Sequence, residues 1–413
     1  MSQRQTSLAE RNHFVDLKLQ GHTLPEIAEA TGWSFECVRR WWRRYRDGGR
    51  SALDPEDGRK QRGGRMSGFS AEMRAAFSEM KENHPRWGAP VARARIGQQM
   101  AVDEAQLPSV STIEKYWAEK HPELLRSHRP QRPKPASEPV PNITAAHERW
   151  QMDFKEWMAV ESVGYIDVLN IRDEATPVKI GSYVYPARKS TGRDIQEALR
   201  EAFSRWGLCD RLQTDRDKRL VSNHHDYPFP TVVVLWLAGL GIVHDIAPSA
   251  PDNGCVECFN GTWYDRVLAG RDFETMQEIQ QTSDDELYWM NHKLPSRGRA
   301  CHGQPPLEAY PEAETPRRPF SPEREFELFS MRRVYDYLSH QFWWRRVSEN
   351  GQVTLGGQRY GVGVDYRNED IRIDFDADTV RFVARTADGK VVKRFPPKQL
   401  TSAHLIGRDG KPG

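Results

Sequence analysis

A proline-rich segment constrains the possible folds most, because it separates two regions with different hydrophobic patterns. Residues 126–141, RSHRPQRPKPASEPVP, contain five prolines and four basic residues. This composition favours an extended, polyproline-like linker. Before the segment, apolar residues recur with helical spacing, whereas short alternating runs typical of strands follow it. We therefore predict a multidomain protein with an all-α N-terminal part and an α/β core.

Residues 1–50 show the pattern of a helix-turn-helix domain. Apolar residues of 8–20 have helical spacing, Thr23 and Ser34 can cap two further helices, and Gly32 fits the turn between them. The last helix is predicted to contact DNA phosphates and base edges, with a solvated charged helix as the alternative. Its arginines are Arg39, Arg40, Arg43, Arg44 and Arg46.

Two linkers flank a second helical region. Residues 51–69 form a basic linker that either lies in a narrow minor groove or is a solvated spacer. Residues 70–125 are interpreted as a second helix-turn-helix or winged-helix DNA-binding domain, with a purely structural role as the alternative. Residues 126–144 are the proline-rich linker. The basic residues of these linkers that we predict to contact DNA are Arg59, Lys60, Arg62, Arg65, Arg129, Arg132 and Lys134.

Strand-like and helical runs alternate over residues 145–310, which predicts an α/β core. Residues 311–341 are predicted to be a linker and a helix. Residues 342–405 contain short alternating strands separated by turns, which predicts a small β-barrel domain. The sequence QFWWRR at 341–346 is interpreted as core with an arginine face rather than as a platform for stacking bases.

Charge is unevenly distributed along the chain. Residues 1–150 hold 25 Lys and Arg against 19 Asp and Glu, and the remaining residues hold 35 against 39. A basic first part and a mildly acidic remainder suit a protein that grips a polyanion with one part and binds cations with another. No apolar run reaches the roughly 18 residues that cross a membrane, and the first residues lack a secretion signal. We therefore expect a soluble cytoplasmic protein without a membrane partner.

Three acidic residues lie where a sheet can bring them together. Asp153 lies in the strand-like RWQMDFKEW, Asp215 ends DRLQTD, and Glu257 lies about one turn into a helix after the PDNG turn. Carboxylate oxygens are the ligands that Mg²⁺ and Mn²⁺ prefer. Two such ions can clamp the attacking and leaving oxygens of a phosphoryl transfer. Composition alone does not select these three among 58 acidic residues.

The motifs around these acids resemble those of a known family. They are W-Q-M-D at 150–153, L-Q-T-D at 212–215 and P-x-N-G-x-x-E at 251–257. In this order they are similar to the motifs of DDE transposases of the retroviral integrase superfamily, in particular bacterial insertion-sequence and phage Mu-type members. The similarity covers about residues 145–285, and the flanking domains also resemble those of such transposases.

The resemblance implies a ribonuclease H-like core in which Asp153, Asp215 and Glu257 are both the catalytic and the metal-binding residues. It implies two Mg²⁺ or Mn²⁺ ions per active site, with Asp153 bridging them. The expected activity is binding of transposon terminal repeats, 3′-end cleavage and strand transfer into target DNA. The expected partners are double-stranded DNA, a homodimer or higher oligomer on DNA, and a helper ATPase, in the nucleoid of a bacterium. A catalytically silent DNA-binding regulator and a hydrolysis-only nuclease are the alternatives.

Some residues depart from the family pattern or compete for a role. Arg216-Asp217 replaces the frequent Asn-Gly after the second aspartate, so Asp217 is a rival metal ligand. Cys255-x-x-Cys258 resembles half a zinc site, although packing cysteines are the favoured interpretation because no second pair lies nearby. The spacing of the five cysteines indicates no disulfide framework. His224-His225 is interpreted as a solvated loop pair and Asp173 as the end of a strand.

Overall fold

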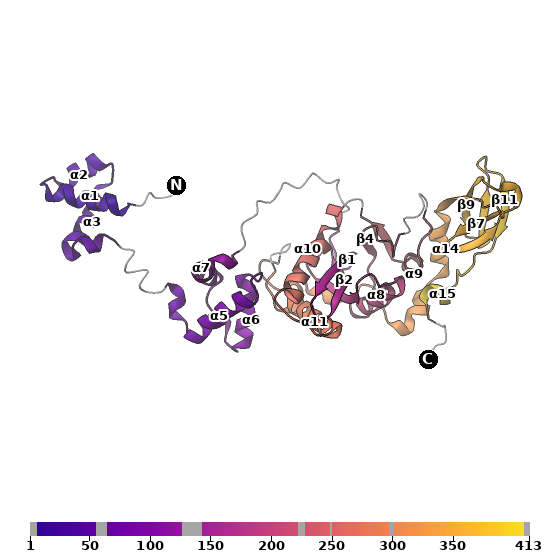
Figure 1. The fold of residues 1–413 in the computed structure, drawn as a ribbon, viewed down its shortest axis with the longest axis horizontal. Coiled ribbons are helices and arrows are strands. Elements are labelled where there is room, and N and C mark those ends of the chain that lie inside the picture. Colours follow the sequence, from indigo (N-terminus) through magenta and orange to yellow (C-terminus); the bar gives the residue numbers. More distant parts are fainter. Residues whose placement is uncertain are drawn as a thin grey trace. The chain divides into compact units, whose positions relative to one another are not determined.

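The computed structural model describes residues 6–54, 64–125, 143–221, 228–247, 250–296 and 301–408 (Figure 1). The chain divides into two compact units, the first comprising residues 1–82 and 99–125 and the second residues 83–98 and 126–413. A search of the described helices finds none with the length and apolar character of a membrane span.

The N-terminal helices form the predicted helix-turn-helix domain. They are α1 (Leu8–Leu19), α2 (Leu24–Thr31) and α3 (Phe35–Gly48). Ser7 and Thr23 each form a capping box, and Ser34 caps α3. Gly32 ends α2 at a φ of 68°, a left-handed conformation that favours glycine. The small core between the helices consists of Phe14, Val15, Ile27, Val38, Trp41 and Leu53.

The following helical region contributes to both compact units. Its elements are the 3₁₀ turns η1 (Arg50–Leu53), η2 (Arg65–Gly68), η3 (Glu104–Gln106) and η4 (Pro122–Leu124) and the helices α5 (Ala71–Asn83), α6 (Ala89–Gln99) and α7 (Val110–Lys120). In the first unit, the Trp117 indole of α7 donates a 2.8 Å hydrogen bond to the Phe77 carbonyl of α5. Helix α6 lies almost entirely in the second unit. There its Arg95 forms an ion pair of 2.6 Å with Glu286.

A five-stranded mixed sheet forms the centre of the second unit. Its strands are β1 (Arg149–Val160), β2 (Gly164–Asp173), β3 (Lys179–Pro186), β4 (Arg211–Thr214) and β5 (Val243–Ile246). The strand order is β3-β2-β1-β4-β5, in which β1, β2 and β3 pair antiparallel and β4 and β5 continue parallel to β1. The prediction of an α/β core is therefore confirmed.

Helices and aromatic side chains pack this sheet. The helices are α8 (Gly192–Trp206), α9 (Val232–Gly239), α10 (Gly254–Trp263) and α11 (Met276–His292), with η5 (Ala250–Asn253) and the π-helical turn η6 (Tyr264–Leu268) at either end of α10. Trp150, Phe203 and Trp236 form consecutive ring contacts with centroids 5.6 and 5.9 Å apart. Helix α9 is apolar on all sides, which suits its buried position. Helix α10 contacts β1 and β2, and this contact places the candidate site.

The C-terminal part forms two sheets, and the prediction of a closed β-barrel is wrong for the described residues. Short helical segments come first: α12 (Pro306–Ala309), η7 (Pro311–Glu314), η8 (Pro322–Arg324), α13 (Glu325–Leu328) and α14 (Met331–Ser339). The following elements are β6 (Phe342–Arg346), β7 (Gln352–Leu355), β8 (Gln358–Gly361), η9 (Val364–Tyr366), β9 (Asp370–Asp376), β10 (Arg381–Arg385), β11 (Val391–Phe395) and α15 (Ser402–Ile406).

One C-terminal sheet is antiparallel with the strand order β11-β10-β9-β6, and its edge strands β6 and β11 do not pair with each other. The other sheet consists of β7 and β8. The apolar side chains of these sheets belong to the same core cluster as those of the α/β sheet. They are therefore buried against the rest of the second unit and not inside a barrel. Trp343 of β6 is 1% exposed, so its interpretation as core is confirmed. The two parts are also tied by a buried ion pair, in which Arg200 of α8 contacts Glu325 of α13 at 2.8 Å.

Candidate active site

Asp153 and Asp215 lie on neighbouring strands of the sheet, Asp153 within β1 and Asp215 directly after β4. Strands β1 and β4 run parallel with Met152 opposite Thr214, so the two acids that follow occupy the same level of the sheet. Burial raises the pKa of Asp153 to about 6, and the negative charges of Asp215 and Glu257 add to this rise. Burial also raises the pKa of Asp215, with a further contribution from Asp217. The structure therefore brings the first two predicted acids together.

Helix α10 presents Glu257 and Asn260 to the same place. The amide Nδ2 of Asn260 donates a 2.7 Å hydrogen bond to Oδ2 of Asp153. Glu257 lies three residues earlier and therefore on the same face of the helix. Together with Asp153, both side chains line a cavity of about 770 Å³. The third predicted acid thus faces the first across an open cavity.

A buried chain of hydrogen bonds fixes the orientation of Asn260. Ser182 Oγ donates to Asn170 Oδ1 at 2.5 Å, and Asn170 Nδ2 donates to Asn260 Oδ1 at 2.7 Å. Because Asn260 accepts this bond through its oxygen, its nitrogen is directed to Asp153. One oxygen of Asp153 is thereby engaged, and Asn260 is a site residue that the sequence analysis missed.

The side chain of Asn253, the N-cap residue of α10, makes no cap hydrogen bond. Two glutamine side chains bond to the backbone at this end of the helix instead. Gln151 Oε1 accepts hydrogen bonds from the backbone N–H groups of Cys255 and Val256 at 3.1 and 3.2 Å. Gln151 Nε2 and Gln213 Nε2 both donate to the Asp252 carbonyl, at 3.0 and 2.9 Å. A glutamine two residues before each aspartate, in W-Q-M-D and L-Q-T-D, is the sequence signal that could have revealed them.

The carboxylate of Asp217, the rival metal ligand, forms an ion pair with Arg219. Arg219 bonds to both carboxylate oxygens of Asp217, and its Nε lies 2.8 Å from Oδ1. The same guanidinium contacts Glu156 at 2.8 Å and lies 3.5 Å from the ring centroid of Phe154. Paired in this way, the Asp217 carboxylate is a poorer candidate for a metal than Asp153, Asp215 or Glu257.

The donor chemistry of the three acids fits a hard divalent cation. All three supply carboxylate oxygens, and burial, together with the charges of the other two acids, raises the pKa of Asp153. Within the residues that the structure covers, no group of three or more His, Cys, Asp or Glu side chains is close enough to hold a metal ion.

The other residues singled out by the sequence have simpler roles. Asp173 ends β2, and its carboxylate accepts hydrogen bonds from Thr176 and from the His147 backbone. Cys255 and Cys258 carry free thiols, and within the described ranges they form no metal-binding group. His224 and His225 lie outside the described residues.

The predicted DNA contacts are displayed on α3. Its five arginines are exposed, whereas Val38 and Trp41 face the core. Arg39, Arg40, Arg43 and Arg44 line a groove of about 820 Å³. Arg65 is exposed in η2. The remaining predicted contacts, Arg59, Lys60, Arg62, Arg129, Arg132 and Lys134, lie outside the described residues.

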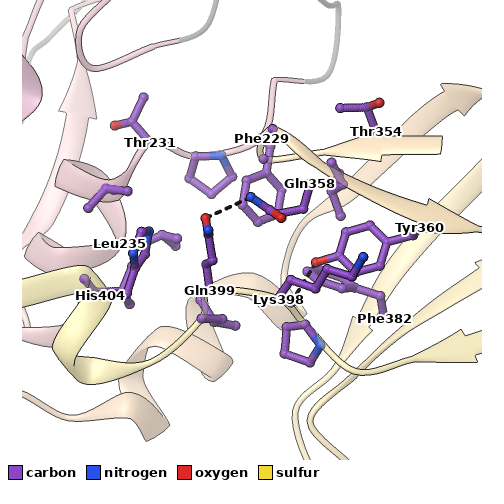
Figure 2. Close-up of a pocket in the computed structure, with 18 of the residues that line it drawn as sticks. Phe229, Thr231, Leu235, Thr354, Gln358, Tyr360, Phe382, Lys398, Gln399 and His404 are labelled. Atoms are coloured by element: carbon purple, nitrogen blue, oxygen red, sulfur yellow. Dashed lines mark hydrogen bonds between the residues drawn. The ribbon is translucent and has the colours of Figure 1, made fainter.

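A second cavity of about 400 Å³ lies where α9 and α15 meet the C-terminal sheets (Figure 2). Its walls include the rings of Phe229, Tyr360 and Phe382, and a 2.8 Å hydrogen bond joins Gln358 to Gln399. None of the three predicted acids lines it.

Comparisons with known proteins agree with the N-terminal domain. A helix-turn-helix domain model matches residues 10–65. No curated protein sequence matches the chain. The chain thus has a DNA-binding type of N-terminal domain, followed by a mixed α/β core.

Among solved structures, the simian T-cell lymphotropic virus intasome, in complex with the PP2A regulatory subunit B56 gamma, is similar over 74% of this chain and 96% of its own. Its identity is 13% and its TM-score 0.33. The HTLV-2 integrase catalytic core domain in complex with magnesium, in a trimeric form, covers 40% of this chain and 97% of its own, with 14% identity and a TM-score of 0.30. The dimeric form has 13% identity and a TM-score of 0.29. These identities and TM-scores do not indicate an activity for this chain.

Proposed function

We propose that this protein is a DDE-type DNA transposase, related to bacterial insertion-sequence and phage Mu-type enzymes, that cleaves transposon 3′ ends and joins them to target DNA. The observation that carries the proposal is the position of Asp153 and Asp215 on adjacent parallel strands, with Glu257 facing Asp153 across one cavity. The five-stranded mixed sheet, with strand order β3-β2-β1-β4-β5, supports the α/β core that the resemblance implies.

In this proposal, the two aspartates and Glu257 hold two Mg²⁺ or Mn²⁺ ions, which supply the Lewis acidity that phosphoryl transfer needs. Asn260 keeps Oδ2 of Asp153 in place. Lys155 lines the same cavity as an exposed cation and is placed to attract the phosphate backbone of DNA, whereas Arg86 pairs with Asp265 there at 2.7 Å. Burial of Asp153 reduces its contact with water, which strengthens its interactions with charged groups.

Joining two transposon ends requires two active sites, so we propose that a dimer or higher oligomer assembles on DNA. The helix-turn-helix domain would bind the terminal repeats, and a helper ATPase is an optional partner in target capture. A DNA-binding regulator without catalysis is the second candidate. It is favoured by the lack, within the described ranges, of a cluster already close enough to hold a metal ion.

The proposal predicts metal-dependent joining by the wild-type protein. Duplex oligonucleotides from both flanks of the coding region, incubated with the protein, Mg²⁺ and a target plasmid, should yield joined products. Chelation of Mg²⁺ should abolish them, because carboxylates alone do not stabilise the charge that develops in phosphoryl transfer. Nicking without joining would identify a nuclease, and binding without either reaction would identify a regulator. Joining without the helper would remove the ATPase from the proposal.

The exposed arginines of α3 predict a salt-dependent loss of DNA binding. Replacement of both Arg43 and Arg44 by alanine should weaken duplex binding about tenfold or more at moderate salt and reduce the slope of log K against log salt by about 2, because each phosphate contact releases about one counterion. Fluorescence anisotropy over a salt series measures both. Lys18→Ala, which removes a cation of α1 bonded to the His22 carbonyl, is the matched control. An unchanged slope would contradict phosphate contact by α3.

A further inference from the structure

The β1–β2 hairpin carries two exposed stacked rings, and Arg188, which follows β3, packs against one of them. The rings of Trp157 and Tyr165 are stacked, with centroids 4.5 Å apart and an interplanar angle of 17°. The guanidinium of Arg188 lies 4.1 Å from the Trp157 ring centroid. Trp157 is 50% exposed and Tyr165 52% exposed. A large aromatic surface is therefore held open to solvent, where it adds little to folding stability.

The backbone beneath this stack is strained. Trp157 and Arg188 both have a φ of 60°, which is unfavourable for non-glycine residues by on the order of 1–2 kcal/mol each. Trp157 lies in an irregularity of β1, between Lys155 and Met158, that changes the register with β2. Such bulges redirect side chains and commonly lie next to active sites.

One buried carboxylate holds both strained residues. Asp167 is fully buried, and its two oxygens accept the backbone N–H groups of Trp157 at 2.8 Å and Arg188 at 2.7 Å. A glycine at either position would adopt the conformation without strain. The backbone at Trp157 is strained, a buried acid stabilises it, and the indole is exposed. Together these features indicate that the position of the ring serves contact with another molecule.

The stack lies on the same strand as Asp153. Trp157 lies four positions after Asp153, which corresponds to roughly 13 Å along a strand. Lys155 and Glu156 lie between them and line the cavity of the candidate active site. Glu156 and Asp217 share the positive charge of Arg219, which lies 2.8 Å from Glu156, whereas Lys155 and Arg188 present exposed cations. The surface between the cavity of the candidate active site and the Trp157–Tyr165 stack is therefore suited to a polyanion that also carries aromatic rings.

We propose that the stack of Trp157, Tyr165 and Arg188 binds, on the outer ring face of Tyr165, an unpaired nucleobase of the DNA strand whose phosphate occupies the acid cavity, a few nucleotides from that phosphate. The proposal rests on the proposed function, because it takes DNA as the substrate. Bases stack on aromatic rings irrespective of sequence, and a neighbouring arginine adds attraction to the strand. Two rings offer far less area than the roughly 800 Å² per partner of a stable protein interface, which favours a base over a protein.

The test compares binding of two DNA probes to the full-length protein without metal. One is a blunt duplex, and the other is the same duplex with a four-nucleotide unpaired 3′ extension. Wild type should prefer the extended probe, and Trp157→Ala, Trp157→Gly and Tyr165→Ala should each reduce this preference about tenfold, the size of one stacking contact. Tyr165→Phe should retain it. Phe342→Ala removes an exposed ring of β6 that also lies under an arginine, Arg372, and should change nothing.

Thermal melting separates this role from a structural one. Both Trp157 variants remove the ring, but glycine also relieves the strain at φ 60°, so Trp157→Gly should melt higher than Trp157→Ala while binding equally poorly. Unchanged preference in the Trp157 variants would overturn the proposal. The proposal would also be overturned if the Trp157 variants kept their preference for the extended probe but lost self-association in sedimentation. That result would identify a second copy of the chain as the partner that contacts the rings. If wild type prefers unpaired DNA through Trp157 but never joins it, the base site stands and the transposase function fails.

Discussion

Replacing Asp153, Asp215 or Glu257 by the matching amide is expected to reduce strand joining by on the order of a thousandfold and to leave duplex binding unchanged. Each amide keeps the shape of the side chain but removes a negative charge from the metal ligands. A divalent ion contributes several kcal/mol to phosphoryl transfer, and each 1.36 kcal/mol corresponds to a factor of ten. The measurements are joining of end-containing oligonucleotides, Mn²⁺ binding by titration calorimetry and duplex binding by anisotropy.

Two further acids make this experiment specific. Asp245→Asn removes a carboxylate from β5 of the same sheet, where it pairs with Arg211 at 2.6 Å, and should leave joining within a few-fold of wild type. Asp217→Asn tests the rival ligand. Since Arg219 already occupies Asp217, this variant should retain Mn²⁺ binding. Substantial joining by any of the three site variants, or loss of Mn²⁺ binding in Asp217→Asn alone, would contradict the assignment.

Local signals predicted the elements that depend on local physics. Thr23 and Ser34 cap the helices that begin after them, and Gly32 makes the turn, because these effects act over a few residues. The strands that carry Asp153 and precede Asp215 were also predicted, since their apolar runs differ from the helical spacing around them.

The closure of the C-terminal sheets could not be predicted in this way. Barrel closure depends on pairing between the first and last strands, and alternation within each strand gives no information about it. The apolar face of β9 and β10, which includes Ile373 and Phe382, is as consistent with an open sheet over a shared core as with a barrel. The structure shows the open arrangement.

The residues around the acids were missed for a different reason. Asn260 acts through a bond to Asp153 across 107 positions of sequence, and Gln151 reaches the start of α10 across 104. A buried amide and an exposed one look alike in a sequence. Likewise, neither the φ of 60° at Trp157 nor the bonds from Asp167 that maintain it produce a pattern that periodicity detects.

Replacement of Gln151 by leucine is expected to reduce joining by on the order of a hundredfold and to raise the Mg²⁺ concentration required for half-maximal joining. The substitution leaves two N–H groups at the start of α10 without their acceptor, at about 1–3 kcal/mol each. The first turn of α10 carries Glu257, and a displacement of about 1 Å in a catalytic group can cost a factor of about 100. Hydrogen exchange at Cys255 and Val256 should accelerate in the same variant.

Gln213→Leu provides an internal comparison, because it removes a single bond to the Asp252 carbonyl, which Gln151 still satisfies. Its effect on joining should therefore be about tenfold smaller than that of Gln151→Leu. Gln196→Leu controls for general destabilisation, since Gln196 is fully buried in α8 and bonds to the Leu405 carbonyl at 2.9 Å. If all three variants lose joining in proportion to their loss in melting temperature, with no change in Mg²⁺ requirement, the glutamines stabilise the fold without positioning Glu257. If the requirement shifts for Gln151 and Gln213 alone, the start of α10 sets the metal affinity of the site.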